Sequence, residues 1–402
     1  MLSRADAPRT VTVYERGTTD IELSDQQAAA LQALRFCSVT PSGQPGIWRI
    51  GDVNQIGVAA LPGLRVHIKP KTSLENILFL ASYAQDQVDL GLSYSYDSGA
   101  GLPTAVAAAF IEAVEQCTLG GLIKGYRTVH QTGNVVRGRW DIPRQMKRRP
   151  GVPLPLELTV DEFTPDVPEN QVLITAVERL VRTPELSDAL RRRMHRLRVS
   201  FDEVLPLRNG PVPEIPQTRL NQHYSYALML ARLIIDSTTW SHRPGQQAGR
   251  SFLIRMPALF ERFVHRVFSR LMSPEGLTVG EQDRSYVLDR GGRVPLRPDL
   301  VIRSGTEVVG IADLKYKVWD AQGGSPPNAD VYQALAYALA AGLDRAHLLY
   351  VSGDVTPAEF EIASAQKTVV AHTVDLSGTP QAIIDSVHRV GREILADALV
   401  AV

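Results

Sequence analysis

The sequence predicts a multidomain protein of mixed α+β and α/β class. With 402 residues, the chain is long enough for two or three domains, each with its own core. Strand-like runs separated by turn signals fill the first 70 residues, and helical spacing dominates the middle. The last third alternates helical and strand patterns, which is typical of a mixed sheet flanked by helices. We therefore expect a β-rich domain over 1–100, a mostly helical region over 101–245 and an α/β domain over 246–402.

Strand patterns account for most of the first domain. Residues 10–15 are β-branched and aromatic, and residues 56–60 and 64–68 are apolar runs on either side of a Pro62-Gly63 turn signal. Ser73 then precedes a stretch with helical apolar spacing and is a suitable N-cap. This region is expected to be β-rich and to end in a helix.

In the middle region we expect helices at 103–119, 170–182, 184–198 and 221–239, and a final boundary in the polar loop 241–249. A basic insertion spans 133–155, and between positions 137 and 149 it carries six basic residues against one acid. The six are Arg137, Arg139, Arg144, Lys147, Arg148 and Arg149. A contact with a protein partner, a DNA track and a merely solvated charge run remain open for this stretch.

Composition excludes several classes of protein. The net charge of zero gives the chain as a whole no attraction to nucleic acid, so any DNA affinity must come from local patches or from a partner. Two distant cysteines and scattered histidines argue against a cysteine or histidine metal site and fit a reducing compartment. The first residues lack the apolar core of a signal peptide, and no apolar run is long enough to span a bilayer. We expect a cytoplasmic protein without membrane contact.

For the C-terminal domain, we expect a helix at 257–272, strands near 286–288, 300–303 and 308–314, a helix at 329–341 and a strand at 347–351. Two motifs lie on these elements. An Arg-Pro-Asp run at 297–299 enters an apolar strand, and Ala-Asp-Leu-Lys-Tyr-Lys at 312–317 ends the next strand. A short hairpin spacing separates them, which would bring their carboxylates together.

These motifs place Asp299 beside Asp313, with Lys315 on the same face of its strand as Asp313 because side chains alternate along a strand. Two carboxylates suit Mg²⁺, which prefers oxygen ligands and keeps most of its waters, and Mn²⁺ can substitute. The peptide oxygen of Leu314 is a further candidate ligand. Lys315 would lie beside the attacking water or the charged phosphate. A structural salt bridge between Asp313 and Lys315 is the competing interpretation.

Two helices add candidates to this site. Glu261 falls at the edge of the apolar stripe of helix 257–272, from where it could serve as a third carboxylate ligand. A solvated glutamate paired with His265 is the alternative. Gln333 and Tyr337 lie one turn apart on the helix after the second motif. They resemble the QxxxY element of RecB-type and lambda-exonuclease-type nucleases, in which the pair faces DNA; an ordinary helix surface is the alternative.

Taken together, the motifs resemble the McrC family, the nuclease subunits of McrBC-type modification-dependent restriction systems in the PD-(D/E)xK superfamily. The matching segments are 68–71, 78–84, 136–142, 162–170, 256–261, 297–302 and 311–317. The resemblance implies a C-terminal PD-(D/E)xK restriction-endonuclease-like domain and an N-terminal part that projects into a ring of partner subunits. The implied partner is a McrB-like AAA+ GTPase or ATPase, which recognises modified DNA and is stimulated by this chain.

One independent observation agrees with that division of labour: the sequence contains no GxxxxGK[ST] phosphate loop, so we expect no nucleotide to bind this chain. The leading hypothesis is a Mg²⁺-dependent DNA endonuclease subunit. Dimerisation through the nuclease domain or pairing of complexes is expected, because a double-strand break needs two active sites. The alternatives are a non-catalytic activator of an AAA+ ring and a RecB-like repair exonuclease that acts alone.

Overall fold

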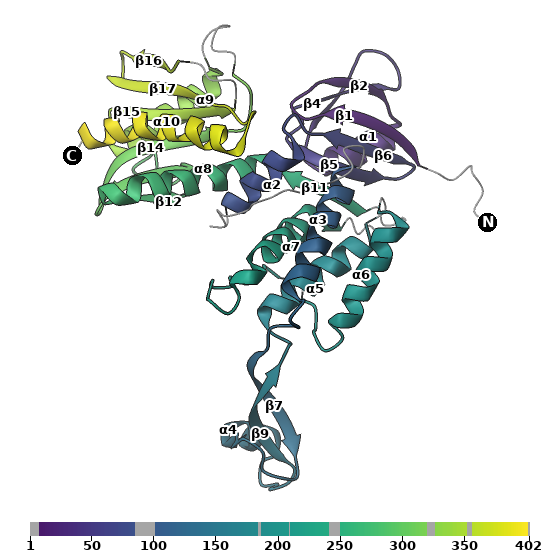
Figure 1. Ribbon diagram of the computed structural model, residues 1–402. Helices are drawn as coiled ribbons and strands as arrows, with labels where there is room; N and C mark the ends of the chain where they lie inside the picture. The colour runs from purple at the N-terminus through teal and green to yellow at the C-terminus, as the bar shows by residue number, and fades with distance from the viewer. Residues whose placement is uncertain are drawn as a thin grey trace. The chain divides into compact units, whose positions relative to one another are not determined.

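A computed structural model describes residues 8–84, 101–183, 186–208, 210–240, 250–319, 326–351 and 356–400 (Figure 1). The chain divides into two compact units. One unit combines Met1–Gly91 with Thr239–Val402, and the other is Leu92–Thr238. The beginning and the end of the sequence thus share a unit, while the middle forms its own. The domain boundary expected at 241–249 lies outside the described residues.

The N-terminal part of the first unit contains two sheets. The larger has the order β1-β6-β5-β11-β10, formed by β1 (Arg9–Tyr14), β6 (Leu64–Lys69), β5 (Gln55–Leu61), β11 (Arg250–Arg255) and β10 (Thr238–Trp240). The smaller has the order β2-β4-β3, formed by β2 (Thr19–Glu22), β4 (Ile47–Gly51) and β3 (Ser38–Pro41). The three expected strands are β1, β5 and β6. Because β11 pairs with β5, the sheet is completed by residues from beyond the middle region.

Two helices accompany these sheets, α1 (Asp25–Ala33) and α2 (Leu74–Tyr83). The N-cap predicted for α2 is confirmed, since the side chain of Ser73 accepts a hydrogen bond from the amide of Asn76. At the pairing of β5 with β11, Gly57 has φ 126°, and a Cβ there would lie 2.1 Å from the carbonyl oxygen of Phe252. That close approach of two strands therefore requires glycine.

The C-terminal part of the same unit is a six-stranded mixed sheet with helices on both faces. Its order is β12-β13-β14-β15-β17-β16, formed by β12 (Leu277–Glu281), β13 (Leu300–Ser304), β14 (Glu307–Lys315), β15 (Arg345–Val351), β17 (Lys367–Val374) and β16 (Ala358–Ile362). Strands β14, β15 and β17 are parallel, and the outer strands pair antiparallel. The flanking helices are α8 (Met256–Met272), α9 (Asn328–Ala341) and α10 (Pro380–Val400), and a 3₁₀ turn covers Ser273–Glu275.

The expected helices at 257–272 and 329–341 are confirmed, as are the strands near 300–303, 308–314 and 347–351. The strand expected near 286–288 is wrong, since this segment forms only an isolated bridge between Val287 and Pro295. The physical reason is Asp289, whose carboxylate accepts the amides of Gly291, Arg293 and Val294 and so bends the chain into a turn. The edge strand is instead β12.

Side-chain alternation decides which helix each residue of this sheet faces. Val301, Ile311 and Tyr350 pack in one buried cluster with Ala334 and Tyr337 of α9. From Ile311 onward, the residues of odd number on β14 therefore face α9, and this set includes 313 and 315. Helix α10 packs against α8, β14 and β17.

The second unit is a helical bundle carrying a small sheet. Its helices are α3 (Leu102–Cys117), α5 (Pro168–Val181), α6 (Asp188–Ser200) and α7 (Ser225–Ser237), the last preceded by a 3₁₀ turn at Gln222–Tyr224. The sheet has the order β7-β9-β8, from β7 (Gly125–Gly133), β9 (Leu156–Thr164) and β8 (Arg139–Trp140), and it carries α4 (Ile142–Arg148). The four expected helices are present, with somewhat different ends. No helix in the described part of the chain is long and apolar enough to cross a membrane.

Candidate functional site

The two motif carboxylates meet at the end of the β13–β14 hairpin. Asp299 immediately precedes β13, and its Oδ2 accepts a hydrogen bond of 2.8 Å from the amide of Leu314. Asp313 is the residue before Leu314 on β14, and it is 2% exposed. Burial, followed by the negative charge of Asp299, raises the pKa of Asp313 to about 7. A buried and a half-buried carboxylate that oppose each other's ionisation create a place where a cation is strongly favoured.

Lys315 lies between this carboxylate pair and α9. Its ammonium forms an ion pair with Asp313 and donates a 2.7 Å hydrogen bond to Oε1 of Gln333. Gln333 Nε2 in turn lies 2.6 Å from the hydroxyl of Tyr337, which donates to the carbonyl oxygen of Arg297. Of the residues predicted as the DNA-positioning pair, the exposed Gln333 contacts the predicted lysine directly, whereas Tyr337 is 3% exposed and is connected to it through Gln333. The competing salt bridge between Asp313 and Lys315 also exists, but as one contact of a larger constellation.

Glu261 reaches the same region from α8. Its Oε2 accepts a 3.2 Å hydrogen bond from Gln282, the residue that follows β12. Burial first, and then the charge of Asp313, raise the pKa of Glu261 above its usual range. The alternative pairing with His265 is wrong, because His265 Nδ1 contacts Glu281 at 2.7 Å instead. Glu261 is therefore close enough to interact electrostatically with the motif carboxylates.

The donor set fits a hard divalent cation in part. Asp313 Oδ2 is buried and receives no hydrogen bond, although the ammonium of Lys315 lies against it. A buried carboxylate oxygen whose only partner is this ammonium suits an oxygen-binding cation. Across the described residues, however, no three His, Cys, Asp or Glu side chains converge as a complete ligand set. Asp299 and Asp313 are the pair that could hold Mg²⁺, with water, Glu261 and the carbonyl of Leu314 available for its remaining positions.

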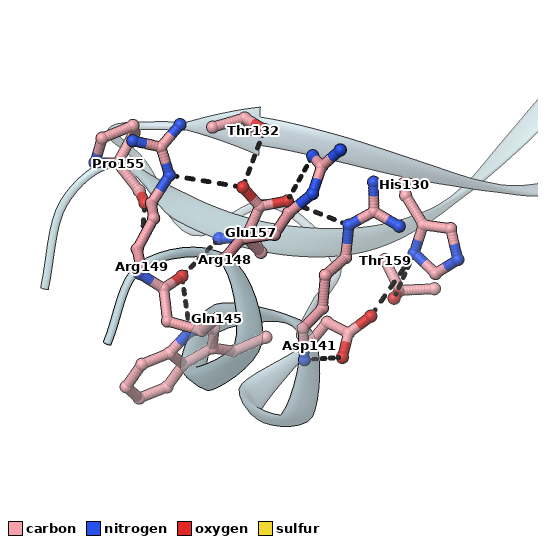
Figure 2. A network of polar contacts seen from close by, with 11 residues as sticks. His130, Thr132, Asp141, Gln145, Arg148, Arg149, Pro155, Glu157 and Thr159 are labelled. Carbon is pink, nitrogen blue, oxygen red and sulfur yellow. Dashed lines mark hydrogen bonds and ion pairs between the residues drawn. The ribbon is translucent and has the colours of Figure 1, made fainter. Parts of the chain in front are cut away.

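The basic insertion forms the outer part of the β7-β9-β8 sheet, where Glu157 is the centre of a polar network (Figure 2). Its carboxylate is contacted by Arg144 at 3.0 Å, Arg149 at 3.4 Å and Arg148 at 3.6 Å, and Thr132 donates to it as well. Burial opposes the charge, but hydrogen bonds from Arg144 and Arg149 outweigh it and keep the pKa of Glu157 low. Three of the six basic residues predicted as a contact, Arg144, Arg148 and Arg149, therefore also stabilise the fold of the basic insertion. This insertion forms the tip of the second unit (Figure 1).

The other three basic residues of the insertion, Arg137, Arg139 and Lys147, lie on the exposed surface of the tip. Exposed apolar side chains accompany them: Val135, Val136, Ile142, Met146 and Leu154. Gly138, with φ 79°, allows β8 to pair with β9, because a Cβ there would lie 2.4 Å from the carbonyl oxygen of Thr159. Apolar and basic groups together make this surface a candidate protein contact.

Sequence reasoning missed the residues that support the site from the N-terminal sheet. Glu15, fully buried, accepts hydrogen bonds from the hydroxyl of Tyr316 and the amide of Lys71. The guanidinium of Arg16 lies 5.0 Å from the ring centroid of Tyr316. Tyr316 stands inside the second motif, but no local pattern links it to residues some 300 positions earlier.

No curated protein matches the chain by sequence. One solved structure is the refined half-complex from a tetradecameric assembly of Thermococcus gammatolerans McrB AAA+ hexamers with bound McrC. It covers 95% of this chain and 100% of that chain, with a TM-score of 0.53 and 18% identity. The likeness extends through both units and shows a shared fold.

A second solved structure, the cryo-EM structure of the Thermococcus gammatolerans McrBC complex, covers 65% of this chain and 88% of that chain at 19% identity and a TM-score of 0.36. The family model described as McrBC 5-methylcytosine restriction system component matches residues 52–351, which is well over half of the sequence. The match includes Asp299, Asp313, Lys315 and the whole basic insertion. The chain therefore belongs to the McrBC family of 5-methylcytosine restriction system components.

Proposed function

We propose that this chain is the DNA-cleaving subunit of a McrBC-like restriction complex and hydrolyses phosphodiester bonds in a Mg²⁺-dependent reaction. The observation that carries the proposal is the convergence of Asp299, Asp313 and Lys315 at one end of the mixed sheet, with Gln333 joined to the lysine. In this interpretation the domain over 246–402 is of the PD-(D/E)xK restriction-endonuclease-like type.

Asp299 and Asp313 would hold the metal ion, with Glu261 and the peptide oxygen of Leu314 as additional ligands. When bound, Mg²⁺ supplies a water of lowered pKa and neutralises charge on the phosphate, and Mn²⁺ supplies the same chemistry. The catalytic value of the site then depends on the two carboxylates being ionised, which their proximity opposes until a cation is present.

Lys315 has the task of stabilising negative charge on the phosphate. In the structure its ammonium is held between Asp313 and Gln333. A metal ion at the carboxylates would compete for Asp313 and leave the lysine free to approach a phosphate oxygen. Gln333, which is exposed, would orient the lysine toward the strand to be cut, and the buried hydroxyl of Tyr337 holds Gln333 in place. These positions require order within about half an ångström, and the hydrogen-bonded chain supplies it.

The second part of the proposal is an AAA+ partner. The similar solved structure is an assembly of McrB AAA+ hexamers with bound McrC. We propose that this chain likewise binds a McrB-like GTPase or ATPase ring and stimulates it, while the ring selects modified DNA. The exposed basic and apolar surface of the tip, which includes Arg137, Arg139 and Lys147, is the candidate contact. The complex would work in the cytoplasm, with pairing of nuclease domains to cut both strands.

A non-catalytic activator of an AAA+ ring is the second candidate. It is favoured by one observation: the described residues provide no complete set of three metal-binding side chains. The two candidates differ in what Asp313 is for. Cleavage would require the carboxylate of Asp313, whereas stimulation of the partner would require only a folded chain with an intact tip.

The test is a plasmid-cleavage assay with the AAA+ protein encoded beside this chain, nucleotide and Mg²⁺. The wild type is compared with Asp313→Ala, and the partner's nucleotide hydrolysis is measured in parallel. We expect cleavage by the wild type alone, with equal stimulation of the partner by both proteins. Cleavage by Asp313→Ala would refute the site assignment, and stimulation without cleavage by either protein would make the chain an activator.

A further inference from the structure

A groove of about 550 Å³ opens beside the candidate site, and its walls come from both ends of the sequence. Arg16 lies in the turn after β1, Asn54 precedes β5, and Pro257 is the second residue of α8. Lys315 is the last residue of β14, and Lys317 follows two positions later. The volume falls within the roughly 300–1,000 Å³ that binding sites for small ligands occupy. Lys315 belongs to both, so the groove and the candidate nuclease site adjoin each other.

The charges in the groove favour an anion. Two carboxylates line the groove. Asp330 is bound by Lys317 at 2.9 Å and by the hydroxyl of Tyr350, and Asp52 is exposed. Arg16 has no carboxylate partner in the described structure. It makes a 3.5 Å hydrogen bond to a carbonyl oxygen, and its Nε is buried without a hydrogen bond.

The backbone holds Arg16 in place before any ligand arrives. Its φ of 53° lies in the left-handed region, which arginine seldom adopts. Its amide donates to the carbonyl of Val53 at 2.8 Å, and its neighbour Glu15 is anchored to Tyr316. The guanidinium is thereby kept over the Tyr316 ring, next to the end of the strand that bears Lys315. A fixed cation loses little conformational freedom when it binds an anion.

We propose that this groove binds the DNA backbone adjoining the phosphate that is cut, and that Arg16 contacts a flanking phosphate there. The inference rests on the proposed nuclease function. A strand with its scissile phosphate at Lys315 must continue past the site, and duplex DNA carries one phosphate every 3.4 Å of helix axis on each strand. The groove adjoins the site, and its two lysines are each paired with a carboxylate, Lys315 with Asp313 and Lys317 with Asp330. Arg16 is therefore the cation of the groove that is available to a phosphate. The N-terminal sheet would thus take part in substrate binding.

The test measures affinity of the full-length chain for a short labelled DNA duplex by fluorescence anisotropy, with Ca²⁺ in place of Mg²⁺ and over a series of salt concentrations. Loss of one phosphate contact lowers the slope of log affinity against log salt by about 0.9. We expect Arg16→Ala to show that change and to bind on the order of tenfold more weakly at low salt. Arg16→Lys should retain the salt slope, because it keeps the charge.

Arg35→Ala is the matched control, since Arg35 is exposed, has φ 57° and does not line the groove. Arg16→Gly, which relieves the left-handed backbone, guards against a folding defect and should behave as Arg16→Ala does. Equal salt slopes for Arg16→Ala and Arg35→Ala would overturn the inference, as would absence of DNA binding by the wild type.

A loss of partner stimulation with unchanged DNA affinity in Arg16→Ala would also overturn the inference, because the groove would then hold a segment of the partner protein. This readout is independent of the nuclease assignment. Cleavage by Asp313→Ala refutes the catalytic site, whereas the salt slope of Arg16→Ala reports on DNA binding at the groove alone.

Discussion

The hydroxyl of Tyr316 donates a 2.5 Å hydrogen bond to the carboxylate of Glu15, although 301 positions separate the two residues in the sequence. Tyr316 directly follows the strand that carries Asp313 and Lys315, and Glu15 directly follows β1. Burial first, and then the charge of Glu15, raise the pKa of the tyrosine. The bond therefore fastens the end of the candidate catalytic strand to the N-terminal sheet.

Removing this hydroxyl should destabilise the protein measurably. In Tyr316→Phe, the buried carboxylate of Glu15 keeps the amide of Lys71 as a donor but loses its second one. An unsatisfied buried partner costs about 1–3 kcal/mol, so urea unfolding should show a loss of that size. Tyr332→Phe is the control, because Tyr332 is 66% exposed. Equal stability of the two variants would mean that the buried bond contributes nothing.

Gln333 should matter for cleavage without mattering for the fold. Its side chain is exposed and bridges Lys315 and Tyr337. Groups that orient a catalytic residue typically change activity by about 10- to 100-fold when removed. We therefore expect Gln333→Ala to lower plasmid cleavage by that factor, with unchanged thermal stability and unchanged stimulation of the partner. Tyr332→Ala on the same helix should cleave normally, and full activity of Gln333→Ala would disprove the positioning role.

The constellation at the end of β14 could be predicted from the sequence because its signals are local. An apolar run fixes a strand, alternation puts Asp313 and Lys315 on one face, and a helical spacing of four aligns Gln333 with Tyr337. The contribution of the N-terminal sheet could not be predicted in this way. β11 joins β5, and Glu15 joins Tyr316, through contacts between residues some 200 to 300 positions apart, for which a single sequence has no periodic signal.

For the tip of the second unit, the sequence showed a local pattern but not the contacts that its residues make. Its charge run was visible, but a count of basic residues cannot show that Arg144, Arg148 and Arg149 converge on Glu157. Burial of that glutamate is decided by the pairing of β7 with β9, which places it opposite Thr132. Three of the six basic residues therefore stabilise the insertion itself, and fewer of them are available to a partner than the count suggested.

Mg²⁺ should stabilise the folded chain through Asp313. A ligand that binds only the native state at 100 times its dissociation constant adds about 2.7 kcal/mol to the free energy of unfolding. In a thermal-melting series we expect the midpoint of the wild type to rise with Mg²⁺ concentration. Asp313→Ala should show little or no rise, because it lacks the buried carboxylate that would bind the ion. Glu307→Ala, an exposed residue at the opposite end of β14, serves as the control, and a parallel rise in Asp313→Ala would exclude metal binding at this site.

Neutralising Glu157 should destabilise the fold of the tip and reduce stimulation of the AAA+ partner. Its carboxylate counters the charge of three arginines, which would otherwise repel one another. We expect Glu157→Gln to be cut faster by trypsin within 137–149 and to stimulate the AAA+ partner less than the wild type does. Glu361→Gln on β16 changes a carboxylate elsewhere and controls for net charge. Unchanged proteolysis would contradict the structural role of Glu157.

The buried pair His347 and His372 predicts a pH dependence of stability. His347 Nδ1 lies 3.1 Å from His372 Nε2, and Asp397 and Arg345 flank the pair from α10 and β15. Burial first, then the positive charges of His372 and Arg345, lower the pKa of His347 well below 6.5. Below pH 6.5, His347 is therefore protonated in the unfolded chain but neutral in the folded chain. The stabilisation due to a neutral His347 is complete above pH 6.5 and is lost progressively as the pH falls below it.

Replacing His347 should remove this component of the pH profile. His347→Asn cannot take up a proton when it unfolds, so its free energy of unfolding should fall less than that of the wild type between pH 7 and pH 5. At pH 7 the variant should be less stable by about 1–3 kcal/mol, because a buried side chain has been shortened. The gap between the two proteins should therefore narrow on acidification. Urea unfolding at several pH values measures it, with the exposed His195→Asn as control; a constant gap would show that His347 titrates alike in both states.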